Sequence, residues 1–121
     1  MTINDVITYV DQVVPNQYST KQKIDWLAEL DELVHFETIL RHENENQEFV
    51  QPTGLDDKLL IEEPYAKQIY PHYVEAKIHY YNAEYGKFNN AMVMYNNNYA
   101  RYTAMYEQDH KPIPQDYRYR F

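Results

Sequence analysis

Apolar residues recur at helical spacing near the start of the chain and predict a first helix over residues 2–14. The apolar positions are Ile3, Val6, Ile7, Val10 and Val14. Thr2, with Asp5 three positions later, has the pattern of an N-terminal capping box. Pro15 ends this helix because a proline has no backbone N–H to continue the hydrogen-bond ladder.

A second helix is predicted from a capping box of Ser19 and Gln22 to about His42. Its apolar positions are Ile24, Leu27, Leu30 and Val34, flanked by Trp26, Leu33 and Leu40. Acidic side chains line much of the remainder, at Asp25, Glu29, Asp31, Glu32 and Glu37. We therefore expect one buried face and one solvated acidic face.

The helical pattern stops over residues 43–63. A polar run opens this segment, and Pro52-Thr53-Gly54 has the composition of a turn. Leu59–Ile61 is the one apolar stretch, and it fits either a short strand or an extended segment held against the core. Residues 43–63 are therefore predicted to form a long polar loop.

Helical spacing returns from about Tyr65 and continues as a heptad-like row that we call the tyrosine seam. Its members are Val74, Ile78, Tyr81, Tyr85, Phe88, Met92, Tyr95, Tyr99, Tyr102 and Tyr106. A break or kink is expected between Asn82 and Lys87, because Asn82 and Gly86 are weak helix formers and good C-cap residues. Two interpretations of the seam stay open: packing against the first two helices, or a surface for another protein. The second interpretation gives Tyr99, Tyr102 and Tyr106 as interface residues.

The last residues form a separate C-terminal arm, residues 112–121. Pro112 and Pro114 forbid a helical turn, so the arm is expected to be extended. Aromatic and basic residues then alternate, as Tyr117, Arg118, Tyr119, Arg120 and Phe121. In an extended chain the aromatic rings share one face and the arginines share the other. Since aromatic and arginine residues dominate interface hot spots, we expect these five residues to dock on a partner or a neighbouring copy; the alternative is that they fold back over their own helices.

These segments together predict an all-α fold, a small bundle of four to five helices over residues 1–111 with a long polar loop and the extended C-terminal arm. A chain of 121 residues fits one domain. The absence of cysteine excludes disulfides, a thiol nucleophile and a cysteine zinc site. No apolar run reaches the length of a membrane span, and no signal-peptide pattern opens the chain, so we expect a soluble protein with no membrane association.

Charge divides the chain into two unlike parts. Residues 1–63 carry fourteen acidic and four basic side chains, whereas residues 64–121 carry five acidic and seven basic ones. The acidic balance opposes tight non-specific binding of nucleic acid, which depends on lysine and arginine contacts to phosphates. The more basic second part is suited to face an acidic partner, including the first part of another copy.

Candidate chemistry is weak in this sequence. His72, Glu75 and His79 share a helical face, but i and i+7 are about 10 Å apart along a helix, too far for one metal ion. The carboxylate pairs, including Asp31-Glu32, are expected to belong to solvated acidic surface. Ser19 is the only serine and already has a capping role. We therefore predict no catalytic residue, no cofactor and no metal, and do not expect an enzyme.

The order and spacing of several motifs resemble a family of small helical head–tail connector, or adaptor, proteins of tailed phages and prophages. The first part contributes Thr2–Val6, Tyr9–Asp11, Pro15-Asn16 and Ile24–Asp31. The middle contributes Leu59–Ile61, Pro64-Tyr65, Tyr70 and Tyr73. The most specific piece is Tyr81–Asn90, followed by Tyr95-Asn96 and Tyr99. The tyrosine- and asparagine-rich second half departs from the more aliphatic helices of other connectors.

This resemblance implies a structural virion protein that assembles as a ring, commonly of twelve copies, below the portal. Such a ring extends the DNA channel and docks the next tail-completion protein, and DNA passes through it without specific binding. The implied location is the head–tail junction of the virion, and the host cytoplasm during assembly. Glu29, Glu32 and Glu37 are candidates for an acidic face of the channel.

Two alternatives remain at the level of sequence. One is a small soluble adaptor or regulatory protein that binds a single protein partner through its tyrosine-rich helix. The other is a metal-dependent enzyme that uses His72, Glu75 and His79.

Overall fold

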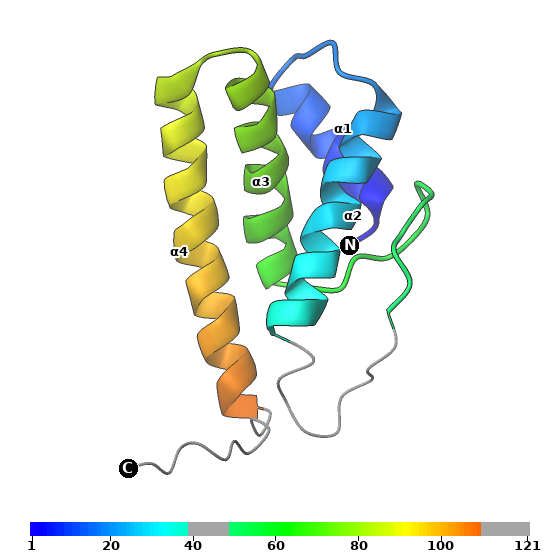
Figure 1. The fold of residues 1–121 in the computed structure, drawn as a ribbon, viewed down its shortest axis with the longest axis vertical. Coiled ribbons are helices and arrows are strands. Elements are labelled where there is room, and N and C mark those ends of the chain that lie inside the picture. The colour runs from blue at the N-terminus through cyan, green and yellow to red at the C-terminus, as the bar shows by residue number, and fades with distance from the viewer. Residues whose placement is uncertain (39–48, 110–121) are drawn as a thin grey trace.

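The computed structural model describes residues 1–38 and 49–109, which form four helices. They are α1 (Ile3–Val13), α2 (Thr20–Glu37), α3 (Tyr65–Tyr81) and α4 (Tyr85–Asp109). Helices α3 and α4 run antiparallel, and α1 and α2 lie on the other side of α3 (Figure 1). No strand occurs within these ranges, and the predicted all-α class is confirmed. The C-terminal arm lies outside the described residues.

Both predicted capping boxes are present. At the start of α1, the Asp5 amide donates to the Thr2 hydroxyl at 3.2 Å and the Thr2 amide donates to the Asp5 carboxylate at 3.0 Å. Ser19 and Gln22 exchange the equivalent bonds at 3.1 Å and 2.9 Å. Each box satisfies backbone N–H groups that have no partner within the helix. Helix α2 ends at Glu37, about one turn before the predicted end at His42, and residues 39–48 lie outside the described ranges.

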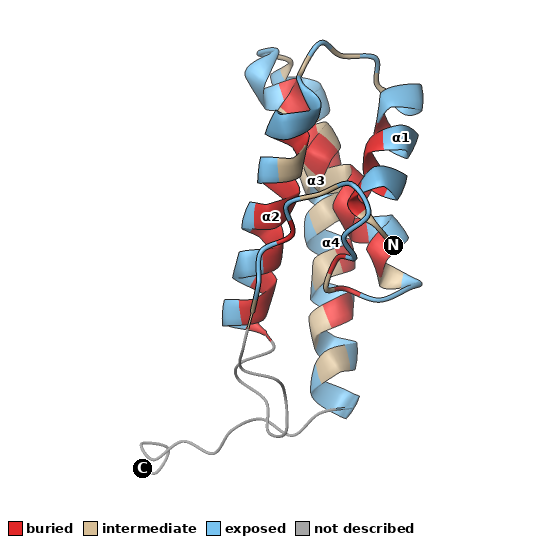
Figure 2. Cartoon of the chain, turned by 90° about the vertical axis from the view of Figure 1, so that its right-hand side faces the viewer, coloured by how far each residue is buried: buried red, intermediate tan, exposed pale blue. Residues whose placement is uncertain are grey.

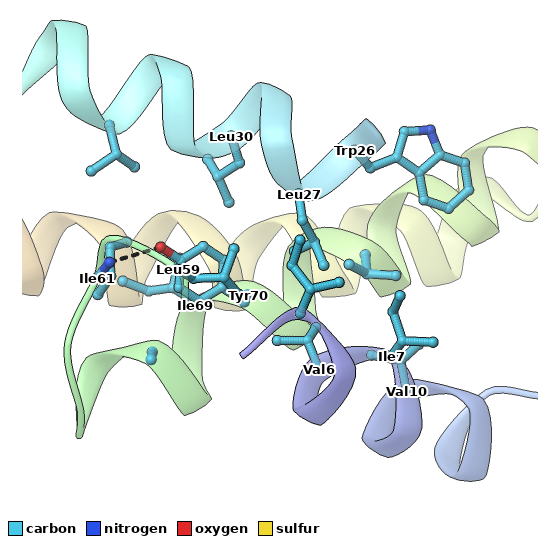
Figure 3. Close-up of a cluster of buried hydrophobic side chains, with 14 of the residues drawn as sticks. Val6, Ile7, Val10, Trp26, Leu27, Leu30, Leu59, Ile61, Ile69 and Tyr70 are labelled. Atoms are coloured by element: carbon cyan, nitrogen blue, oxygen red, sulfur yellow. Dashed lines mark hydrogen bonds between the residues drawn. The ribbon is translucent and has the colours of Figure 1, made fainter. Parts of the chain in front are cut away.

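The hydrophobic core lies between α1, α2 and α3 (Figures 2 and 3). Its fully buried aliphatic side chains include Ile3, Val6, Val10, Leu27, Leu30, Val34, Ile69, Val74 and Ile78. Burial of each stabilises the fold by about 1.5–3 kcal/mol. Tyr102 of α4 joins the same cluster. Figure 2 shows the buried residues on the faces that these helices turn toward one another and the exposed residues on the outer faces.

The apolar stretch Leu59–Ile61 is held against the core and forms no strand. Its backbone bends at Leu60 and Ile61, so the predicted packing on the core is confirmed but an extended course is not. The Leu59 amide donates to the Met1 carbonyl at 3.0 Å, and the Ile3 amide donates to the Asp57 carbonyl at 3.0 Å. A single antiparallel bridge, between Thr2 and Lys58, forms here. The side chains of Leu59 and Ile61 are both buried. The segment therefore fastens the start of α1 to the core.

The turn between α3 and α4 falls inside the predicted window but is not made by glycine. Asn82 caps α3, and Ala83 adopts a left-handed conformation with a φ of 59°. The Glu84 amide donates to the His79 carbonyl at 2.8 Å and closes the turn. Gly86 lies in the first turn of α4, so the break does not occur at this residue.

The tyrosine seam splits into parts with different surroundings. Val74 and Ile78 are buried in the core, whereas Tyr81 and Tyr85 are exposed. The expectation of packing on the first two helices needs correction, because α4 packs chiefly along α3. On α3, the Tyr73 ring meets Tyr95 and the Tyr65 ring meets Tyr102, with centroids 5.3 Å and 5.8 Å apart. Seam residues also contact α2 and its C-cap: Tyr81 stacks on Trp26, and the Tyr99 hydroxyl lies 3.2 Å from that of Thr38.

Within the part of the chain that the structure describes, no helix is a candidate membrane span. Each of the four helices is either too short or too polar to cross a bilayer.

Candidate functional site

A groove lies between α3 and α4, near the turn that joins them. Its cavity of about 360 Å³ lies at the small end of the range for ligand pockets. We call this feature the aromatic groove. Its lining residues are Tyr73, Ala76, Lys77, Tyr80, Tyr81, Phe88 and Met92. The α3 residues recur at intervals of three and four, and Phe88 and Met92 are one turn apart on α4, so each helix presents one face to the groove.

Tyr80 forms one accessible wall of the groove. Its ring contacts Tyr81, Tyr85 and Phe88, with centroids 5.3 Å, 6.3 Å and 5.4 Å away. Tyr80, Tyr81 and Tyr85 remain 50%, 55% and 59% exposed despite these contacts. Three large rings on one surface form an apolar patch of the kind that marks protein-binding sites.

Contacts from α2 and its preceding loop hold the Tyr81 ring in place. The Trp26 ring stacks on it at 5.8 Å with an angle of 10° between the planes. Tyr18 meets Trp26 edge-on at 5.6 Å, and the Tyr18 hydroxyl donates a 2.6 Å hydrogen bond to the Asn82 side chain. One side of the groove is therefore preorganised, which lowers the entropy cost of binding. Sequence reasoning missed this stack because its rings come from three separate segments.

Charge at the groove is mixed. The Lys77 ammonium lies 5.5 Å from the centroid of the Tyr73 ring, a cation–π contact. Burial raises the pKa of Tyr73, the nearby Lys77 opposes this rise, and the carboxylate of Glu29 adds to it. Glu29 follows Trp26 by one helical turn, so both residues lie on the side of α2 that faces the groove. An acidic residue thus lies beside the aromatic lining.

The three predicted channel residues, Glu29, Glu32 and Glu37, are all exposed on α2, but their neighbours differ. Glu29 lies toward Tyr73. Glu37 lies toward Tyr95, where burial and the tyrosines Tyr99 and Tyr73 raise the pKa most and the Glu37 carboxylate adds to the rise. Glu32 accepts a 3.4 Å hydrogen bond from Gln51, in the segment after residue 48. The three carboxylates therefore spread over a broad face.

Asp31 was predicted to be solvated, and this prediction is wrong. Its side chain is 1% exposed and accepts hydrogen bonds from the Tyr70 hydroxyl at 2.6 Å and the Leu60 amide at 3.0 Å. The Ile61 amide donates to the same Tyr70 hydroxyl at 2.8 Å (Figure 3). Burial raises the pKa of Asp31 to about 6, and the two hydrogen bonds oppose that rise.

The arrangement around Asp31 is a structural clasp, because a dissolved substrate does not reach a carboxylate so deeply buried. It ties α2, α3 and the segment Leu59–Ile61 together. Its sequence signal was the position of Asp31, four residues after Leu27 and three before Val34, which places it on the apolar face of α2.

His72, Glu75 and His79 line a second cavity of about 260 Å³ between α3 and α4. His79 is paired with Glu84 through a 3.0 Å contact, and the nearest His72–Glu75 approach is 4.0 Å. In residues 1–38 and 49–109, no cluster of three or more histidine and acidic side chains is placed to hold a metal ion. The geometry therefore gives no support to the metal-enzyme alternative.

The predicted interface residues of α4 lie close to the core. Tyr102 is 7% exposed and offers little surface to a partner, while Tyr99 and Tyr106 are half-buried against it. Rings of Tyr99 and Tyr106 lie 6.1 Å and 5.9 Å from Tyr102. Residues Tyr117–Phe121 lie outside the described ranges. Around the aromatic groove, Tyr80, Tyr81 and Tyr85 are exposed. Tyr81 and Tyr85 belong to the predicted seam, whereas Tyr80 was not predicted as part of it.

No family model matches this chain, and no similar protein was found among the curated proteins or the solved structures. A functional proposal therefore draws on the sequence motifs and on the geometry of the groove.

Proposed function

We propose that this protein is a structural virion protein, a head–tail connector that forms a ring below the portal, extends the DNA channel and docks the tail. The motif order from Thr2 to Tyr99 supports the connector family. The structural observation that carries the proposal is the aromatic groove, whose exposed rings fit contact with another protein. The four-helix fold is compatible with the helical subunits of that family.

Ring assembly requires two different, complementary patches on each subunit. The aromatic groove is one candidate patch, and the basic, aromatic residues Tyr117–Phe121 are another. A ring of roughly twelve copies would use both patches on every subunit. The portal and the next tail-completion protein would meet the two ends of such a ring.

The acidic face of α2 suits a surface past which DNA moves. Glu29, Glu32 and Glu37 are exposed and offer no cation to neutralise phosphates. DNA would therefore pass without specific binding, and no catalysis or cofactor is involved in this role. The proposed location is the head–tail junction, reached from the host cytoplasm during assembly.

One observation favours a second candidate function. The groove and its fixed Trp26–Tyr81 stack form a complete binding surface on a single copy. A small adaptor or regulatory protein that binds one protein partner through its tyrosine-rich helices would need only this surface. The number of copies bound to a partner separates the two candidates.

Cryo-electron microscopy of the full chain mixed with the portal protein from the same genome tests the proposal. A continuous ring of this protein below the portal is expected. Tyr80→Lys, which places a charge on the groove wall, should abolish the ring, whereas the matched control Tyr9→Lys, at a similarly exposed tyrosine of α1, should retain it. Portal particles with no added density, or with a single bound copy, would refute the connector role.

A further inference from the structure

Of the described residues that line the aromatic groove, one carries a charge, Lys77. The others are tyrosine, phenylalanine, methionine and alanine. A partner that covers this surface therefore buries apolar groups around a single positive charge. Burying a charge is costly unless the charge is paired, so Lys77 decides which partner chemistry fits the groove.

Lys77 has no acidic partner in the part of the chain that the structure describes. Its ammonium lies 5.5 Å from the centroid of the Tyr73 ring, and the side chain is half-buried. Four other lysines each lie between 2.8 Å and 3.4 Å from a carboxylate oxygen, namely Lys21, Lys23, Lys67 and Lys87. A carboxylate brought by a partner would therefore meet an ammonium that no described acid neutralises, in a setting where solvent screens the attraction less than it does at an exposed site.

Glu29 does not cancel this charge. It is not among the residues that line the groove, although its carboxylate raises the pKa of Tyr73. Burial raises that pKa most, and the opposing effect of Lys77 is larger than the added rise from Glu29. Charges more than about 8 Å apart are largely screened at physiological ionic strength, so the net charge of -8 on the whole chain matters less here than Lys77 does. The groove itself therefore favours an anion.

We propose that the aromatic groove binds an acidic segment of a partner chain, in which a carboxylate lies directly beside an aromatic or large aliphatic side chain. The apolar side chain lies against Tyr80 and Phe88, and the carboxylate accepts a charge-assisted hydrogen bond from the Lys77 ammonium. The stretch Tyr117–Phe121 does not match this chemistry, because its only charged side chains are arginines. The inference rests on the proposed function in so far as the groove is a contact surface of the assembly, and it adds the chemistry of the segment that the groove binds.

Selection of a displayed library of random peptides on the immobilised full-length chain tests this inference. The retained peptides should be enriched in aspartate or glutamate directly beside an aromatic or large aliphatic residue. They should not be retained by Tyr80→Lys, which places a charge on the groove wall. Lys77→Glu should weaken binding of a selected peptide at least about tenfold in fluorescence anisotropy, because it replaces an attraction with a repulsion.

The matched control is Lys67→Glu, the same charge reversal on the same helix at an exposed lysine outside the groove. It should change the affinity by less than about twofold, as expected for a charge that is screened from the bound peptide. Lys77→Met is the second test variant, because it keeps a long side chain and removes only the charge. It should also weaken binding, and it serves if Lys77→Glu does not fold.

Three results would overturn the proposal: enrichment of neutral or basic peptides, no enrichment at all, or an affinity that Lys77→Met leaves unchanged. Basic aromatic peptides would indicate instead a segment like Tyr117–Phe121. None of these results would decide whether a ring forms on the portal, which microscopy tests separately. A wrong partner chemistry and a failed connector role are therefore distinguishable.

Discussion

The Tyr70 hydroxyl donates a 2.6 Å hydrogen bond to the Asp31 carboxylate across the interface between α3 and α2. The same hydroxyl accepts from the Ile61 amide, and Asp31 also accepts from the Leu60 amide. The side chains of Tyr70 and Asp31 thereby satisfy two backbone N–H groups, those of Leu60 and Ile61, which belong to no helix or strand. Polar groups buried in this way stabilise one arrangement because each alternative leaves a group unpaired.

Tyr70→Phe should destabilise the fold by about 2–3 kcal/mol, because it leaves the Ile61 amide and one oxygen of Asp31 without their partner. Urea unfolding followed by circular dichroism measures this change. Tyr80→Phe, which removes a hydroxyl from a half-exposed ring, is the matched control and should change stability by less than about 0.5 kcal/mol. Equal effects of the two substitutions would contradict the assignment of the clasp.

The raised pKa of Asp31 predicts that the free energy of unfolding depends on pH. Its folded-state pKa of about 6 lies above the ordinary value of 3.8, so between these values the folded state binds the proton more strongly than the unfolded state does. The stabilisation that comes from this stronger proton binding is fully present below pH 4. It is lost as the pH rises through 6. Lowering the pH from 7.5 to 5 should therefore add about 1 kcal/mol of stability through this group.

The comparison with Asp31→Asn isolates that contribution from the other carboxylates. Asparagine stays neutral, so the variant should lack the added stability at pH 5. It is less stable overall because its amide has one acceptor oxygen, whereas the carboxylate uses one oxygen for the Tyr70 hydroxyl and the other for the Leu60 amide. Denaturant titrations of both proteins at pH 5 and 7.5 give the difference. A variant with the same pH response as the unmodified chain would contradict the raised pKa.

Ala83→Gly should stabilise the protein by about 0.5–1 kcal/mol. The left-handed conformation at Ala83 costs a residue with a Cβ about 1–2 kcal/mol, which exceeds the entropy cost of glycine in the unfolded chain. The control Ala100→Gly, at an exposed position inside α4, should instead destabilise by about 1 kcal/mol. Thermal unfolding of the two variants should therefore shift in opposite directions, and a loss of stability in Ala83→Gly would show that the turn carries no such strain.

Charge reversal on α2 tests the proposed channel surface. Because Glu29 lies beside the aromatic groove, the informative variant combines Glu32→Lys with Glu37→Lys and leaves Glu29 unchanged. New cations facing DNA should slow its passage by binding phosphates while assembly continues. Infectivity of phage particles carrying the variant should fall although their tails attach, and unchanged infectivity would exclude these residues from the channel.

Local signals in the sequence were sufficient to predict the helices and their starts. The capping boxes of Thr2 and Ser19 depend on side chains three residues apart, and Pro15 acts within one turn, so no tertiary information is needed. The break after Tyr81 and the C-cap role of Asn82 were also predicted, but not the left-handed conformation of Ala83. Ala83 adopts a positive φ because tertiary packing of α4 on α3 outweighs its local preference.

Features made by several segments could not be predicted in the same way. The exposed aromatic groove depends on how α4 is rotated against α3, which spacing within either helix does not specify. The Trp26–Tyr81 stack joins residues 55 positions apart. The buried state of Asp31 follows from its partner Tyr70 on another helix, since a carboxylate on an apolar face remains costly until that hydrogen bond exists.

The central claim is that the exposed aromatic residues of this protein are buried by contact with other copies in a ring on the portal. Native mass spectrometry of the full chain bound to the portal protein from the same genome tests it most directly. We predict a complex with many copies of this chain per portal assembly, and its loss with Tyr80→Lys but not with Tyr9→Lys. A stoichiometry of one copy, or binding that Tyr80→Lys leaves intact, would contradict the account.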